Sequence, residues 1–236
     1  MGRQWLQKNK EITANKKAKI TSKLVREITV AAKMGTPDPD MNPRLALAIE
    51  AARKQSVSND VIKRAINKGA GIGGESVEFE TILYEGMAPH NVPLIVECLT
   101  DNRNRTGSDI KSLWKNGQFG SKVMFLFDHC GIVEATHEDG GVDIEEAAIE
   151  AEAQDVEPLE GVPEDHSGGR FFTDVPDLYK VADALRAAGW NVASAELGYV
   201  AKDAITLEGD ARTEVEEFLE KIDDHDDVHR IHAALK

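Results

Sequence analysis

The stretch KKAKITSKLVREITVAAKM, residues 16–34, decides the fold of the first third of the chain. At about 100° per residue in a helix, its basic residues fall within about 40° of one direction. These residues, named here the basic ridge, are Lys19, Lys23, Arg26 and Lys33. A separate apolar stripe consists of Ile20, Leu24, Ile28 and Ala31. The pattern predicts a helix that packs its apolar stripe on a core and presents the basic ridge to solvent.

Two further helices are expected in the first 72 residues. The three expected helices span residues 13–34, 43–55 and 59–68. Asn42 is the expected N-cap of the second helix, with Pro43 at its first position. Ser58 is the expected cap of the third helix, and Gly69 ends it. The sequence therefore predicts an N-terminal three-helix domain.

The third helix has the same division of charge as the first, with Lys63, Arg64 and Lys68 opposite its apolar residues. Most Lys-rich helix faces are simply solvated, but here few acids balance the charge: none lies between Glu11 and Glu27. Phosphate backbones attract such surfaces through charge neutralisation and counterion release. The candidate nucleic-acid-binding residues of the helical domain are Lys16, Lys17, Lys19, Lys23, Arg26, Lys33, Arg44, Lys63, Arg64 and Lys68.

Charge is divided unevenly along the chain. Residues 1–72 hold 15 basic and 6 acidic side chains, a net charge of +9. The remaining residues hold 13 basic and 36 acidic side chains, a net charge of -23, which gives the chain its total of -14. An asymmetry of this size predicts a module that faces nucleic acid, joined to an acidic body that phosphate repels.

The hydrophobic period changes from helix to strand after about residue 75. Strands are expected at 81–87, 93–100 and 122–127, with a helix at 106–115. A βαββαβ unit follows, with strands at 131–136, 156–160, 170–173 and 192–197 and helices at 142–153 and 176–188. A strand at 204–207, a helix at 211–222 and a strand at 228–233 are expected last.

This order of elements predicts an α+β multidomain protein. The three-helix domain, residues 1–74, is followed by two ferredoxin-like α+β domains, the second inserted in the first. The first of these two domains is discontinuous and comprises residues 75–130 and 201–236, and the inserted domain comprises residues 131–200. Three sequential domains, the last a small αβ cap, are the alternative arrangement.

A polar loop follows the expected strand at 93–100. Its arginines, Arg103 and Arg105, lie in a region that holds few other basic residues. One interpretation is a second contact to phosphate, or a docking loop. The other is a helix start, in which Asn104 or Thr106 caps the helix and the arginines pair with nearby acids.

A glycine run at residues 69–74 matches the pattern G-x-G-x-x-G. Dinucleotide binding requires a strand before this pattern and a helix after it, but here a helix precedes and a strand follows. We interpret the run as a hinge. The segment at 122–127 is apolar at successive positions, which favours a strand buried on both faces.

Metal and thiol chemistry find no support in the sequence. His225, His229 and His232 lie among four aspartates, and we expect a solvated acidic turn there rather than a metal site. Cys98 and Cys130 lie in apolar surroundings and are expected to be buried free thiols.

Catalytic motifs are also missing. The sequence has no nucleophile elbow, Walker motif or zinc-ligand spacing, so we expect no enzyme activity, no cofactor and no small-molecule substrate. No apolar run is long enough to span a bilayer, and the first residues lack a secretory apolar segment. We therefore expect a cytoplasmic protein without a membrane partner.

Several stretches resemble the signature of the YebC/PmpR family. They are KLVREITVAA at 23–32, DPD at 38–40, NPRL at 42–45, YEG at 84–86 and VECLTDNRNRT at 96–106. The opening GRQW at 2–5 departs from the Gly-His-Ser-Lys-Trp common in the family. The resemblance implies a helical first domain followed by two α+β domains. It also implies a probable transcriptional regulator that binds DNA, while a mitochondrial relative activates translation of cytochrome c oxidase and bacterial members are linked to ribosomes.

Two functions follow from these observations. The first is a DNA-binding transcriptional regulator that uses the basic ridge and has its acidic domains as a dimer or partner surface. The alternative is a ribosome-associated translation factor that places the same ridge on ribosomal RNA, with Arg103 and Arg105 near a functional centre. Both use phosphate contacts, which position a protein without reading sequence.

Overall fold

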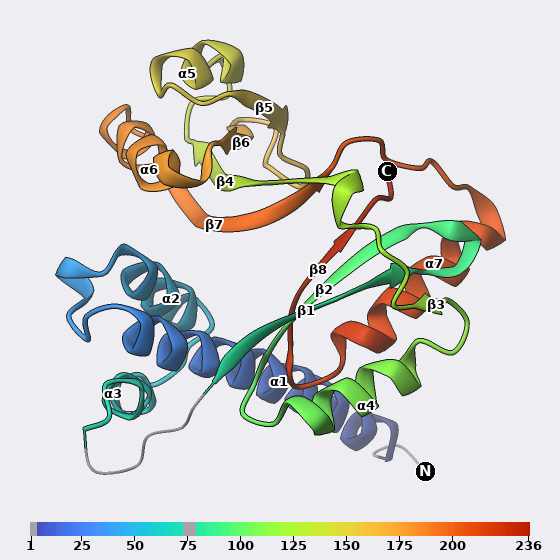
Figure 1. Cartoon of the computed structure of the whole chain (residues 1–236). Coiled ribbons are helices and arrows are strands. Elements are labelled where there is room, and N and C mark those ends of the chain that lie inside the picture. The colour runs from blue at the N-terminus through green and yellow to red at the C-terminus, as the bar shows by residue number, and fades with distance from the viewer. Residues whose placement is uncertain (1–3, 73–78) are drawn as a thin grey trace. The chain divides into compact units, whose positions relative to one another are not determined.

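A computed structural model describes the backbone of residues 4–72 and 79–236 and the side chains of residues 17–72 and 79–236 (Figure 1). Three features of the sequence lie outside these ranges: Arg3, where the opening departs from the family, the side chain of Lys16, and the last two glycines of the run at 69–74.

The helical domain consists of α1 (Gln4–Met34), α2 (Pro43–Lys54) and α3 (Asn59–Gly69), so the first helix begins nine residues earlier than predicted. Asn42 joins α1 to α2. Its Oδ1 accepts a hydrogen bond from Leu45 N at 3.1 Å, and its Nδ2 donates to Ala31 O at 2.9 Å. The expected cap is confirmed, and the cap residue also fixes the end of the preceding helix.

The core of the helical domain lies where the apolar faces of the three helices meet. Its buried residues include Ile28, Ala32, Leu45, Ile49, Ala52, Ile62 and Ala65. The end of α3 touches α1 so closely that a Cβ on Gly69 would collide with the backbone oxygen of Thr29. Glycine is therefore required at this position for packing. The predicted role of Gly69 in ending the helix is wrong, because Ala70 is the C-cap and the glycine with a positive φ is Gly71.

The first sheet has the strand order β3-β1-β2-β8, and every neighbouring pair is antiparallel. Its strands are β1 (Glu80–Met87), β2 (Pro93–Thr100), β3 (Gln118–Phe119) and β8 (Val228–Ala233). The helices α4 (Arg103–Leu113) and α7 (Gly209–Asp223) cover one face (Figure 1). Leu94, Val96, Trp114, Phe218 and Ile222 form part of the core between helices and sheet. The face of β2 opposite that core carries the acid Glu97.

The second sheet has the order β5-β6-β4-β7, again antiparallel throughout. Its elements are β4 (Phe127–His137), α5 (Ile144–Glu150), β5 (Asp155–Pro158), β6 (Ser167–Thr173), α6 (Leu178–Ala187) and β7 (Asn191–Ala201). This is the βαββαβ order of a ferredoxin-like domain. Val133, Phe171, Val181, Leu185 and Trp190 are among its buried residues.

The predicted fold class is confirmed: a helical domain is followed by two α+β domains, and the second interrupts the first. The chain forms two compact units, residues 1–125 with 203–236 and residues 126–202. The helical domain thus belongs to the same unit as the first sheet. The proposed three-domain boundaries stay a prediction.

Two predicted strands are wrong. The segment expected as a buried strand at 122–127 forms a 3-10 turn at Met124–Leu126, and Phe125 is 70% exposed. The backbone N–H groups of Val123 and Met124 donate to Glu85 Oε2, so a side chain has taken the hydrogen bonds that a strand would use. The segment at 204–207 is not a strand either. Its Ile205 makes an isolated parallel bridge with Leu235.

Candidate nucleic-acid interface

The basic ridge meets an acidic turn of the same chain. The turn joins α7 to β8, and its acids are Asp223, Asp224, Asp226 and Asp227. Lys19 Nζ lies 3.0 Å from Asp224 Oδ1, and Lys23 Nζ lies 2.7 Å from Asp223 Oδ1. Arg26 Nη1 lies 3.1 Å from Asp227 Oδ1. The prediction that acids do not balance the charge of these three residues is therefore wrong.

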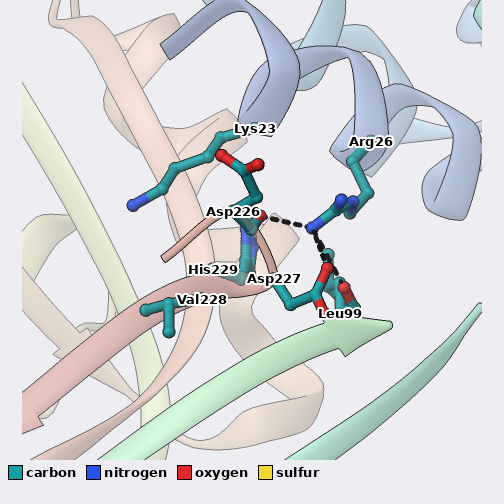
Figure 2. Close-up of a pocket in the computed structure, with 7 residues that line it drawn as sticks. All are labelled: Lys23, Arg26, Leu99, Asp226, Asp227, Val228 and His229. Carbon is teal, nitrogen blue, oxygen red and sulfur yellow. Dashed lines mark hydrogen bonds and ion pairs between the residues drawn. The ribbon is translucent and has the colours of Figure 1, made fainter. Parts of the chain in front are cut away.

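Arg26 is the most deeply engaged of the three. It donates to the backbone oxygens of Leu99, at 3.2 Å, and of Asp226 (Figure 2). Its guanidinium carbon also lies 5.6 Å from the centroid of the Phe79 ring. Because these contacts join α1 to β2 and to the acidic turn, Arg26 holds the helical domain against the first sheet.

Asp227 is the centre of this junction and is only 3% exposed. While its Oδ1 faces Arg26, its Oδ2 accepts hydrogen bonds from Thr106 Oγ1 at 2.6 Å and from Arg105 Nη2 at 3.0 Å. Burial alone would raise the pKa of Asp227, but the hydrogen bonds from Thr106 and Arg105 and the charge of Arg26 outweigh it and lower that pKa. The carboxylate therefore stays ionised between the two arginines.

The loop that carries Arg103 and Arg105 is the start of α4. Its N-cap is Asn102, whose Oδ1 accepts from Arg105 N at 3.1 Å, instead of Asn104 or Thr106. Arg105 pairs with Asp101 at 3.1 Å as well as with Asp227. Arg103 remains 70% exposed, 3.7 Å from Glu80, and its contact with phosphate stays a prediction.

A second group of polar residues lies between α1 and β8. Arg44 donates from Nε to Glu27 Oε1 at 2.8 Å and from Nη2 to Glu27 Oε2 at 3.3 Å. Burial opposes ionisation of Glu27, but the hydrogen bond from Arg44 and the neighbouring positive charges lower its pKa. Arg44, predicted as a phosphate contact, is thus used to neutralise a buried acid.

The histidines near the acidic turn are not solvated, contrary to the prediction. Strand β8 begins at Val228, and it carries His229 and His232 into largely buried positions. Burial, aided by the charge of Arg230, lowers the pKa of His229 to about 4. His229 is therefore neutral at pH 7, with its Nε2 3.1 Å from Glu27 Oε2. Within the described residues, no group of three or more ligating side chains could hold a metal ion.

The outward side of α3 differs from the basic ridge. Its basic residues, named here the α3 face, are Lys63, Arg64 and Lys68, and all three are exposed. Arg64 Nε donates to Asp60 O at 3.2 Å. Among the described side chains, no carboxylate forms an ion pair with the α3 face, with Lys17 or with Lys33. The positive charge of these residues is therefore not neutralised by any carboxylate that the structure describes.

The sequence analysis missed the acidic turn as a partner of the ridge. The signal was present as four aspartates within five residues, in a body with a surplus of acids that matched the surplus of bases in the helical domain. From the sequence alone these aspartates are expected to be solvated, because nothing local indicates which distant helix they would meet.

Fold and charge together define a class of protein: a basic helical domain joined to two antiparallel α+β domains, the second inserted in the first. A model of the TACO1/YebC protein N-terminal domain matches residues 2–72, and a model of the TACO1/YebC second and third domain matches residues 79–235. The chain belongs to the TACO1/YebC family, which confirms the resemblance stated from its sequence motifs.

Relatives of known name cover the whole chain. A probable transcriptional regulatory protein of Pseudomonas syringae pv. tomato is 48% identical over 238 residues, spanning 100% of this chain and 99% of that protein. A probable transcriptional regulatory protein of Bdellovibrio bacteriovorus is 45% identical over 240 residues, spanning 100% of both chains. The crystal structure of a conserved hypothetical protein from Aquifex aeolicus is 34% identical, with a TM-score of 0.81 over 93% of this chain and 90% of that one.

None of the described helices is long and apolar enough to cross a membrane.

Proposed function

We propose that this protein is a non-enzymatic regulator of transcription that acts in the cytoplasm and binds DNA through the α3 face. The names of its relatives support the regulatory part of this proposal. The exposure of Lys63, Arg64 and Lys68 supports the binding part, and it is the observation that carries the proposal. Lys17 and Lys33 are exposed on α1 and would add to the same attraction.

The α3 face is favoured over the paired residues of α1 because a free cation binds phosphate more readily than a neutralised one. A lysine that meets DNA releases the counterions condensed on the phosphates, and this release drives binding. A lysine already paired with a carboxylate must first give up that partner. Because the α3 face has no such partner among the described residues, its charge is available without any rearrangement.

Contacts of this kind do not read bases. They would serve DNA and ribosomal RNA alike, so the two functions predicted from the sequence share one surface. Arg103, exposed at the start of α4, is the candidate for an additional phosphate contact in the same unit. Arg26, Arg44 and Arg105 are engaged within the protein, and we assign them to its architecture.

The test is charge reversal of the α3 face in the full-length protein. The K63E/R64E/K68E variant should lose at least about tenfold in affinity for a short labelled DNA duplex at low salt, since up to three phosphate contacts are lost. A matched control, K111E/K115E/K122E, changes the net charge equally at exposed lysines of the first α+β domain. Fluorescence anisotropy would measure affinity, and circular dichroism would verify the fold.

Equal losses in the two variants would overturn the assignment to the α3 face. Crosslinking in cells, followed by sequencing of the bound nucleic acid, separates the two functions. Enrichment of promoter DNA would support transcriptional regulation, whereas recovery mainly of ribosomal RNA would replace it with the translational function.

A further inference from the structure

We propose that Lys19 and Lys23 form a second phosphate-binding surface, masked by Asp223 and Asp224, which nucleic acid displaces. This inference rests on the proposed function, because it concerns how the same ligand gains additional contacts. It assigns a role to the acidic turn that the sequence motifs do not suggest: its carboxylates occupy positions that phosphates would take.

The spacing of the ridge fits a phosphate backbone. Lys19, Lys23 and Arg26 lie within eight residues of α1, and the seven steps from the first to the last cover about 10 Å at 1.5 Å per residue. One strand of DNA presents a phosphate about every 3.4 Å along its axis, so a row of this length covers the axial rise of about three nucleotides. The acidic turn supplies three carboxylates to the same row, one for each cation.

The three ion pairs differ in how readily they can be exchanged. The side chains of the Lys19–Asp224 pair are 41% and 62% exposed. In the next pair Asp223 is 59% exposed and Lys23 is 21% exposed, and Lys23 also donates to the backbone oxygen of Asp223. Exposed pairs gain little net free energy, because water and salt screen them. Phosphates can therefore replace Asp223 and Asp224 without leaving a buried carboxylate unpaired, because both carboxylates are exposed to water.

The Arg26–Asp227 pair is the fixed end of the mask. Asp227 is buried, and Thr106 and Arg105 hold its second oxygen. Removing Arg26 from it would leave the buried carboxylate with one charged partner, Arg105, in place of two, which is unfavourable. The mask therefore opens at its outer end, at Lys19 and Lys23, while α1 stays attached to the first sheet through Arg26.

A mask of this kind sets a threshold for binding. The apparent affinity of a site falls with the fraction of molecules in which that site is open. A short or sparsely charged polyanion gains too few contacts to displace the aspartates, whereas a longer phosphate backbone first bound at the α3 face presents its phosphates at high local concentration.

The test removes the two masking charges but keeps the shape of the side chains that carry them. The D223N/D224N variant of the full-length protein should bind a short labelled DNA duplex roughly three- to tenfold more tightly at low salt than the control, because the masked site is then open. The control, E216Q/E217Q, makes the same charge change at exposed, ion-paired acids of the same helix. It corrects for the general effect of net charge.

A second pair of variants ties the gain to the ridge. Adding K19Q/K23Q to D223N/D224N should abolish the extra affinity. The single variant D224N, at the most exposed of the three pairs, tests the same mask with the least disturbance of α7. A smaller gain in DNA affinity is expected from it. Circular dichroism verifies the fold of each variant.

The outcomes separate the mask from the proposed function. If K63E/R64E/K68E loses affinity while D223N/D224N matches its control, the mask is overturned and the α3 face stands. A gain that survives K19Q/K23Q also overturns the mask. If the wild type does not bind DNA but D223N/D224N does, the mask is supported and the α3 face fails as the primary site. If neither binds, both proposals fail.

Discussion

The basic ridge of α1 and the α3 face look alike in the sequence but differ in the structure. Each is a set of lysines and arginines opposite an apolar stripe on a helix of the same domain. Three of the four residues of the first, all but Lys33, meet acids about 200 residues away in the chain, and the second meets none among the described residues. The comparison shows that the charge pattern of a helix does not reveal whether the charge is available to a ligand. The location of the opposite charge decides that.

The largest expected effect concerns the buried end of the ridge. Asp227→Ala should lower the free energy of unfolding by about 3–5 kcal/mol, because Arg26 and Arg105 lose their shared partner in the interior. Asp224→Ala, which removes an exposed partner of Lys19, should change it by no more than about 0.5 kcal/mol. Urea unfolding of the two variants and the wild type measures this difference. Equal, small changes would contradict the view that Asp227 anchors α1.

The next largest effect is a dependence of stability on pH that arises from His229, which lies on β8 beside Glu27 of α1. His229 has a pKa of about 4 in the folded chain and 6.5 as its ordinary value, although Glu27 and Glu97 nearby favour its protonation. The unfolded chain therefore binds a proton between pH 6.5 and 4 that the folded chain does not bind. Stability should fall as the pH is lowered through this range, by up to about 3 kcal/mol.

Urea unfolding at a series of pH values checks this prediction. In the His229→Gln variant the fall between pH 6.5 and 4 should be smaller, because that proton has no site in either state. Asp227 and Glu27 have lowered pKa values in the folded chain, so the stability that they contribute is lost only at still lower pH. Identical profiles for the variant and the wild type would show that His229 is not the group responsible.

A third effect, on stability, distinguishes Arg44 from the residues of the α3 face, although the sequence predicts phosphate contacts for all four. Arg44→Ala should lower the free energy of unfolding by about 2 kcal/mol, because the buried carboxylate of Glu27 loses two charged hydrogen bonds. The same change should leave DNA affinity nearly unaltered. Denaturation and anisotropy on one preparation test both parts. A large loss of affinity in the folded variant would return Arg44 to the binding surface.

The features that sequence reasoning predicted correctly depend on neighbouring residues. The helical domain and the βαββαβ unit follow from hydrophobic periods read over ten to twenty residues, and Asn42 as a cap follows from its next three residues. The prediction of a strand at 122–127 fails because Glu85, distant in the sequence, accepts hydrogen bonds from two backbone N–H groups of this segment. The masking of Lys23 by Asp223 and the burial of His229 depend likewise on partners that only the folded chain brings together.

The smallest expected effect gives the most direct comparison, because it removes one exposed lysine from each surface. Lys63→Ala and Lys19→Ala should each change stability by no more than about 0.5 kcal/mol, as expected for surface substitutions. Their effects on binding should differ. Lys63→Ala should lower DNA affinity a few-fold and reduce the slope of log affinity against log salt by about 0.9, the value for one phosphate contact. Lys19→Ala should leave the slope unchanged on a short duplex, because Asp224 already neutralises that charge. Anisotropy titrations at several salt concentrations measure both slopes, and equal slopes would mean that the two surfaces are equally available to DNA.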